Sequence, residues 1–285
     1  MIGQTRYGRF PTRVKSSDPA RMKVGALHRV RYRRDVTNAP LRIEPAADVL
    51  DASRRWLSPV REALEGSFLS AYLTGSVLVQ GFSVERQRIN ILIVARSLDG
   101  DTLDHVAAAI PSSKRPPHFD PLFLTHDQIV ASLDVFPIEF LEIQECHLRL
   151  EGADVLGAIT VPRRHLRLQC EQELRGKHLR LRQEYLAAGH DAKRLQHALD
   201  ALASSFHTQF RTLLRLQGEP VPASLERVID RIAQLHRVDA AALLGPHLVR
   251  HSDDTLKEAE VRDRYRRFLS AIESLIGAID GLQLK

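Results

Sequence analysis

Two short stretches decide the fold of this chain: AYLTGS at residues 71–76 and RINILIV at residues 88–94. The first has the pattern of a strand that runs into a Gly-Ser turn, and the second that of a buried strand whose start is polar. Side chains two apart in a strand point to the same face, so Arg88 and Asn90 are expected to share one face. If the two strands pair, both residues lie near Gly75 and Ser76.

The flanking sequence predicts a small mixed α/β unit of about four strands. Nearly continuous branched apolar residues at 89–94 are typical of a strand covered on both faces. Strands are expected at 68–73, 89–94, 121–124 and 137–143. Helices are expected at 46–64, with a kink or break at Pro59, and at 101–110 and 126–132.

After Pro162 the apolar residues recur with helical spacing and strand-like runs disappear. Long amphipathic helices are expected at about 166–185, 195–213 and 261–282, with shorter ones near 223–235 and 240–248. Helices that each carry one apolar stripe bury it by packing into an antiparallel bundle. The predicted fold class is therefore α+β, with a mixed-sheet domain at 45–161 and an α-helical bundle at 162–285.

Residues 1–44 form a third region, poor in large apolar residues, which we interpret as a flexible basic arm. Residues 1–35 hold ten Lys or Arg and two Asp, a formal charge of +8, whereas the other 250 residues sum to −2. One interpretation is a tail that binds phosphate or nucleic acid. The other, which we favour, is an unstructured extension, with translation starting at Met22.

The composition indicates where in the cell the protein is expected to work. No apolar run approaches the roughly 18–20 residues that span a bilayer, and residues 1–10 lack the apolar core of a signal peptide. The two cysteines, Cys146 and Cys170, lack the spacing of a metal site and are expected to be small buried residues. A cytoplasmic protein without a membrane partner is expected.

The Gly-Ser hairpin resembles the active-site hairpin of the polymerase-β-like nucleotidyltransferases. In that superfamily Gly-Ser is followed, after about ten residues, by Asp-x-Asp or Asp-x-Glu at the start of an apolar strand. The resemblance implies backbone N–H groups at Gly75 and Ser76 that approach phosphates. It also implies two carboxylates that hold divalent metal ions, and a third carboxylate on a neighbouring strand that acts as ligand or base.

Downstream residues extend the resemblance to the streptomycin and spectinomycin type of aminoglycoside adenylyltransferase, over about residues 46–285. Glu139 lies in the apolar run expected to be a strand. The resemblance implies that Glu139 acts as the general base. A Gly152-x-Asp154 segment then leads toward the helices, and residues 168–182 look like the first bundle helix of that family.

The chain departs from this family at the two metal-binding carboxylates. Arg88 takes the place of the first and Asn90 that of the second. A guanidinium repels Mg²⁺, and a carboxamide offers an oxygen without charge. Gly81 falls one residue later than the family's second glycine, and Glu85 is a conceivable substitute ligand. We therefore expect no metal site here.

Three hypotheses follow. The leading one is a catalytically degenerate, non-enzymatic protein that binds nucleotide or phosphate through Gly75, Ser76, Arg88 and Asn90, or that acts as a protein-interaction module. If the protein is an interaction module, Arg88 would pair with Glu139 or Glu142 and close the site.

The first alternative is an active Mg²⁺-dependent enzyme that moves AMP from ATP to a small-molecule or protein hydroxyl, with Glu139 as base. ATP and Mg²⁺ are cofactors only in that case. The second alternative is phosphate or nucleic-acid binding through the arm at residues 1–35.

Overall fold

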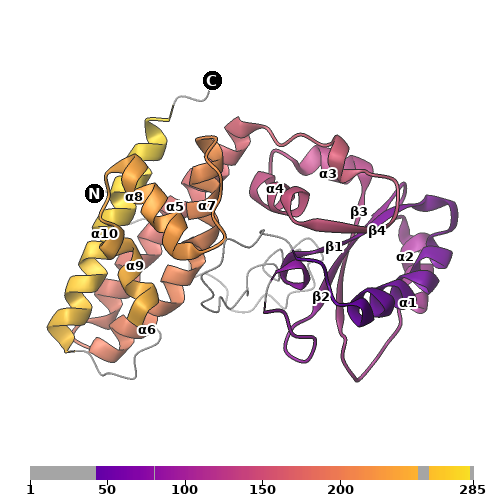
Figure 1. Cartoon of the computed structure of the whole chain (residues 1–285), viewed down its shortest axis with the longest axis horizontal. Coiled ribbons are helices and arrows are strands. Elements are labelled where there is room, and N and C mark those ends of the chain that lie inside the picture. Colours follow the sequence, from indigo (N-terminus) through magenta and orange to yellow (C-terminus); the bar gives the residue numbers. More distant parts are fainter. Residues whose placement is uncertain (1–42, 80, 250–256, 283–285) are drawn as a thin grey trace, which may run out of the picture. The chain divides into compact units, whose positions relative to one another are not determined.

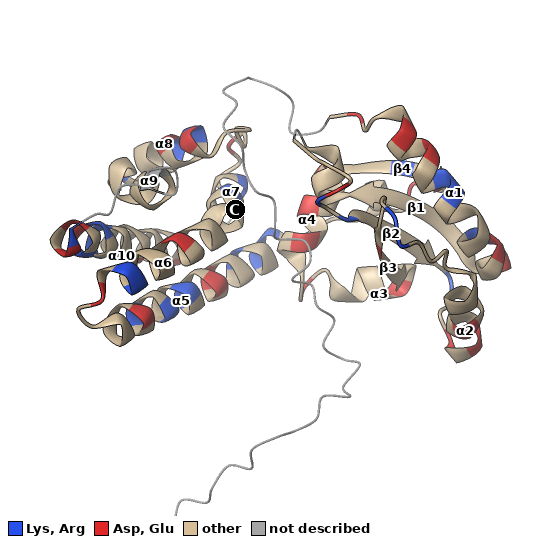
Figure 2. Cartoon of the chain, turned by 90° about the horizontal axis from the view of Figure 1, so that it is seen from below, with Lys and Arg blue, Asp and Glu red and all other residues tan. Residues whose placement is uncertain are grey.

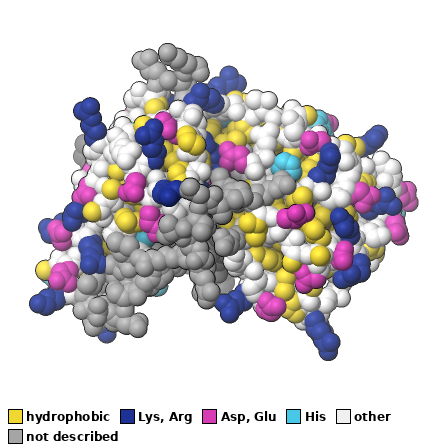
Figure 3. Space-filling model, in the orientation of Figure 1, with side chains coloured by type: hydrophobic (Ala, Val, Ile, Leu, Met, Phe, Trp, Pro, Cys, Tyr) yellow, Lys and Arg dark blue, Asp and Glu magenta, His cyan; other side chains and the backbone are white. Residues whose placement is uncertain are grey.

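The computed structural model describes residues 43–79, 81–249 and 257–282. Nearly all of the predicted basic arm lies outside these residues, so its predicted properties stay predictions. Among the described residues, none of the helices combines the length and the apolar character needed to cross a membrane. Basic and acidic side chains are interspersed over the visible described surface (Figure 3).

A four-stranded mixed sheet forms the centre of the N-terminal half (Figure 1). Its strands are β1 (Phe68–Thr74), β2 (Ile89–Ala95), β3 (Phe119–Thr125) and β4 (His147–Gly152), in the order β3-β2-β1-β4. β1 runs antiparallel to β2 and to β4, and β2 runs parallel to β3. The first two strands therefore pair, which is the condition under which Asn90 lies near the Gly75-Ser76 turn.

Helices cover both faces of the sheet (Figure 2). Helix α1 (Ala47–Leu64) and helix α2 (Gly100–Ala109) bury apolar side chains against one face, where Ile89, Ile91 and Ile93 of β2 point. Helix α3 (His126–Ser132) and helix α4 (Pro137–Glu145) cover the other face, where Leu92 and Val94 point. Burial on both faces explains why β2 is apolar at almost every position.

The C-terminal half is helical, and its buried residues form one large core cluster. Its helices are α5 (Arg163–Ala188), α6 (Ala192–Ala203), α7 (His207–Leu216), α8 (Leu225–His236), α9 (Ala240–Val249) and α10 (Glu258–Asp280). The predicted α+β class, with a mixed sheet followed by a helical region, is confirmed. The helix expected over 195–213 is divided by a 3-10 turn at Ser204–Phe206. The sequence did not reveal this division, because the apolar spacing continues through the turn.

The strand predicted at 137–143 is wrong, because this segment forms helix α4. Pro137 occupies the start of the helix, where its missing N–H costs nothing. Glu139, Glu142 and Glu145 recur every third residue, which is a helical spacing that the dense apolar residues between them obscure. The expected count of four strands holds because β4 supplies the fourth, and its alternating sequence HLRLEG went unassigned.

Of the kink or break expected at Pro59, the break is wrong, since α1 continues to Leu64. A proline removes one N–H and disturbs the carbonyl four residues earlier, which here belongs to the exposed residue Arg55. Solvent can hydrate a carbonyl on that side, so the helix tolerates the proline.

Gly152→Ala is expected to destabilise the protein by about 3 kcal/mol or more. Gly152 pairs with Ser70 of β1 at φ +88°, and an added Cβ would lie 2.1 Å from the carbonyl oxygen of Leu69. Gly66→Ala is the matched control, because apart from the adjoining backbone no atom lies within 4 Å of its Cβ position. Urea unfolding of both variants checks the prediction, and equal stability would contradict it.

Candidate functional site

The candidate site lies at the end of the sheet where β1 stops and β2 begins. Thr74, the last residue of β1, pairs with Asn90 on one side and with His147 on the other. Asn90 in turn pairs with Asp120 of β3. One row across the four strands therefore holds a carboxylate, a carboxamide, a hydroxyl and an imidazole.

Gly75 and Ser76 begin a 3-10 turn, Gly75–Leu78, directly after β1. Gly75 has φ +72°, a conformation that a residue with a Cβ rarely adopts, so the glycine is required by the backbone. Thr74 precedes the turn without a side-chain cap to its N–H groups. The predicted turn is present at the predicted residues.

Arg88 lies one residue before β2 and is exposed. Its Nη2 donates a hydrogen bond to the carbonyl oxygen of Phe119 at 2.7 Å. Because Arg88 precedes the strand, alternation does not fix its direction, and its face relative to Asn90 stays a prediction. One N–H group of the guanidinium donates to the start of β3, and the guanidinium has four further N–H donors.

Asp120 is a residue of this row that the sequence reasoning missed. It lies beside Asn90 in the parallel pair of β2 and β3, whose backbones are about 4.8 Å apart. The only signal in the sequence is an Asp-Pro pair that opens an apolar run, and this pattern does not reveal which strand becomes its neighbour. The carboxylate on a strand next to β2 is thus Asp120, and Glu139 lies elsewhere.

Glu139 lies on the first turn of α4, and Gln169 of α5 holds it. Gln169 donates from Nε2 to Glu139 Oε2 at 2.9 Å and accepts the N–H of Ile138 on its Oε1, also at 2.9 Å. The side-chain amide of Gln169 therefore satisfies two groups at the start of the helix, one of them an N–H that the helix itself leaves unpaired. This arrangement gives Glu139 a role in attaching α4 to α5.

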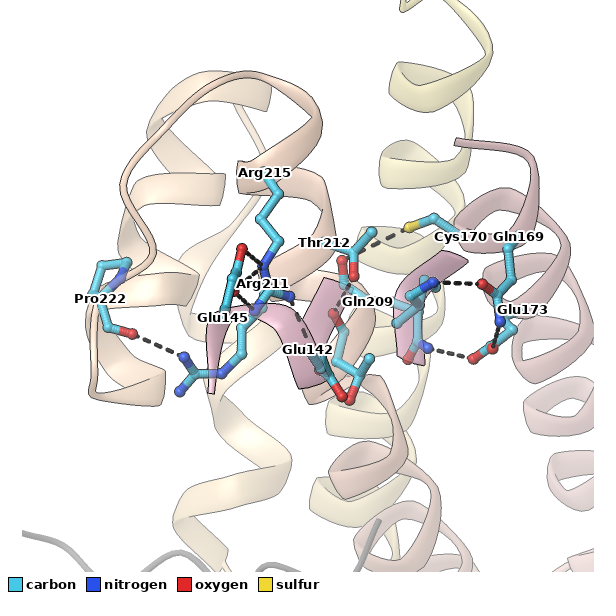
Figure 4. A network of polar contacts seen from close by, with 12 residues as sticks. Glu142, Glu145, Gln169, Cys170, Glu173, Gln209, Arg211, Thr212, Arg215 and Pro222 are labelled. Carbon is cyan, nitrogen blue, oxygen red and sulfur yellow. Dashed lines mark hydrogen bonds and ion pairs between the residues drawn. The ribbon is translucent and has the colours of Figure 1, made fainter. Parts of the chain in front are cut away.

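Arg215 of α7 binds the other two acidic residues of α4 (Figure 4). Its Nε and Nη2 contact Glu145 at 2.6–3.0 Å, and its Nη1 lies 3.9 Å from Glu142. The Arg215 side chain is only 10% exposed. The predicted ion pair of Arg88 with Glu139 or Glu142 is not formed, since Arg88 contacts Phe119 instead.

The same network continues into the helical half through Glu173 (Figure 4). Glu173 accepts hydrogen bonds from Lys177 at 2.7 Å and from the buried amide of Gln209. The neighbouring Cys170 is fully buried beside this carboxylate. Burial, and secondarily the negative charge of Glu173, raises the pKa of the Cys170 thiol to about 12.

The residues present do not fit the metal ions that the family resemblance implies. Within residues 43–79, 81–249 and 257–282, no three His, Cys, Asp or Glu side chains gather closely enough to hold a metal ion. Glu85, the conceivable substitute ligand, accepts a hydrogen bond from Ser83 at 2.6 Å, and this bond lowers the pKa of its carboxyl group. Asp120 alone supplies negative charge to the row.

Comparison with known proteins gives little beyond this geometry. No protein-family model matches the chain, and no curated protein matches its sequence. One similar solved structure is the spectinomycin adenyltransferase AAD(9) from Enterococcus faecialis, with ATP and spectinomycin. The match covers 79% of this chain and 98% of that one, at 11% identity and a TM-score of 0.42. At this level of similarity, we assign no activity from it.

The contact of Arg215 with Glu145 is expected to be energetically coupled. A double-mutant cycle with Arg215→Gln and Glu145→Gln should give a coupling of about 1–2 kcal/mol, because the arginine is mostly buried and the contact is forked. The exposed pair of Arg182 with Glu273, 51% and 63% exposed, is the control and should give about 0.5 kcal/mol or less. Equal couplings would contradict the prediction.

Cys170 is expected to resist alkylation in the folded protein, because its thiol is buried and almost none of it is thiolate at pH 8. Cys146 is half-buried and is the internal control. Iodoacetamide labelling followed by peptide mass spectrometry should modify Cys146 before unfolding and Cys170 only after it. Rapid native labelling of Cys170 would show that the α5 core opens readily.

Proposed function

We propose that this chain is a catalytically degenerate nucleotidyltransferase-like protein that binds the phosphates of a nucleotide without a metal ion. The observation that carries the proposal is the exposed Arg88 at the start of β2, where metal-dependent transfer would need a carboxylate. A cation at this position repels Mg²⁺ and attracts phosphate by the same electrostatic interaction.

The binding groups are those of the sheet end. Gly75 supplies backbone without a side chain, and Ser76 supplies a hydroxyl group beside β2. Arg88 supplies a guanidinium that can fork onto phosphate oxygens, and Asn90 supplies a carboxamide. A nucleotide triphosphate brings its own negative charge, so this set needs no cation to complete it. ATP is the nucleotide that the family resemblance suggests.

The contacts of Glu139 support the absence of transfer chemistry. A general base must reach the hydroxyl whose proton it takes, whereas Glu139 is hydrogen-bonded to Gln169 on the neighbouring helix. All three acids of α4 are engaged by residues of α5 or α7. We therefore propose a protein that binds nucleotide and does not transfer AMP.

Asp120 favours one alternative, an active enzyme that transfers AMP from ATP to a small-molecule or protein hydroxyl. Its carboxylate lies beside Asn90, so a single cation held by these two oxygens and the triphosphate itself is chemically reasonable. This alternative requires Mg²⁺, and the positive charge of Arg88 would oppose the binding of that ion.

Calorimetric titration with ATP tests the proposal. The proposal predicts binding of equal affinity in Mg²⁺ and in EDTA, weakened about tenfold by Arg88→Gln because a charge-assisted contact is lost. Arg86→Gln, which removes an exposed charge two residues earlier, is the matched control and should change affinity little.

Two results would overturn this proposal. One is ATP binding that needs Mg²⁺ and is strengthened by Arg88→Gln. The other is transfer of label from [α-³²P]ATP to a protein or aminoglycoside acceptor, lost in Asp120→Asn. Together they would establish the active enzyme.

A further inference from the structure

A hollow of about 460 Å³ lies between α5 and α6, away from the sheet. The two helices run side by side (Figures 1 and 2). Cavities that hold small organic ligands typically measure about 300–1,000 Å³. Its wall carries Lys177 and Arg180 from α5 and Arg194 and His197 from α6, while Ala198 and Leu202 form part of an apolar floor.

Several basic residues of α5, including Lys177 of this wall, have carboxylate partners. Arg167, Arg175 and Arg182 are paired with carboxylates of α5 or α10, at 2.5–3.3 Å. Lys177 is likewise neutralised by Glu173, at 2.7 Å.

Arg180 is exposed, and none of the described carboxylates lies within 4.0 Å of it. This holds even for Glu184, which lines the same hollow one helical turn away, where an ion pair would ordinarily form.

Arg194 is a second cation of the hollow without a carboxylate partner in the described part of the chain. It occupies the first turn of α6, whose N-cap is Asp191. The Asp191 carboxylate accepts a hydrogen bond from the backbone N–H of Arg194 at 3.0 Å and offsets the partial positive charge of this turn, but it makes no ion pair with the Arg194 guanidinium group. The lining of one hollow therefore holds two guanidinium groups, of Arg180 and Arg194, that have no carboxylate partner among the described residues.

We propose that this hollow binds a small phosphomonoester with an apolar or aromatic group. The Arg180 and Arg194 guanidinium groups would fork onto the phosphoryl oxygens, a geometry that suits this group well. The floor at Ala198 and Leu202 would contact the apolar part, and Glu184 would accept a hydrogen bond from a hydroxyl or amine of the ligand. The site is separate from the nucleotide site proposed at the sheet.

Calorimetry on the full chain with phenyl phosphate as the probe tests this site. Wild-type protein is expected to bind phenyl phosphate more tightly than inorganic phosphate, because of the apolar floor, and more tightly than benzoate, because of its second charge. The double variant Arg180→Gln, Arg194→Gln should weaken binding about tenfold or more. Arg175→Gln, on α5 but outside the hollow, is the control and should leave it unchanged.

Four outcomes would overturn the proposal: no binding of phenyl phosphate up to about 10 mM, equal affinity for benzoate, equal affinity for inorganic phosphate, or binding that the double variant retains. Arg88→Gln separates this site from the sheet site. Phenyl phosphate binding that Arg88→Gln abolishes and the double variant keeps would assign the anion to the sheet and leave this hollow without a ligand. Circular dichroism of each variant confirms that it is folded.

Discussion

The antiparallel pairing of β1 with β2 is the constraint on which the rest of the N-terminal half depends. It sets Thr74 opposite Asn90, so the turn at Gly75 begins beside the start of β2. The parallel pairing of β2 with β3 then adds Asp120 to the same row. A slip of one residue would turn Ile89, Ile91 and Ile93 from the α1 side of the sheet to the other. Burial on both faces therefore fixes the geometry of the candidate site.

Charge decides what this geometry can do. The acids that might serve chemistry are engaged in structure, since Gln169 and Arg215 bind the three glutamates of α4. In the described part of the chain, the row of Asp120, Asn90, Thr74 and His147 holds one carboxylate, that of Asp120, and the exposed Arg88 contacts the residue before it, Phe119. In the helical half, carboxylates pair with the arginines of α5 that face α10, and the arginine facing α6 is left uncompensated. Both proposed sites are places where positive charge is not neutralised within the described chain.

The sequence was informative where burial sets a clear period. The continuous apolar residues of β2, the stripe of α10 and the change of pattern at Pro162 each predicted the element that forms there. It failed at α4, because apolar residues fill the positions between its glutamates and hide the helical period. It missed β4, whose outward side chains are polar. It also could not reveal that Gln169 binds Glu139, or that Asp120 lies beside Asn90, because those contacts depend on tertiary structure and strand order.

The central claim is that Arg88 and Asn90 leave the sheet end unable to hold a divalent cation. Electron paramagnetic resonance of Mn²⁺ in the presence of the protein measures this directly. We predict no bound Mn²⁺ at this site in the wild-type chain, and bound Mn²⁺ once Arg88→Asp and Asn90→Asp supply the two missing carboxylates. Tight Mn²⁺ binding by the wild-type chain, lost in Asp120→Asn and unimproved by the two substitutions, would contradict the account.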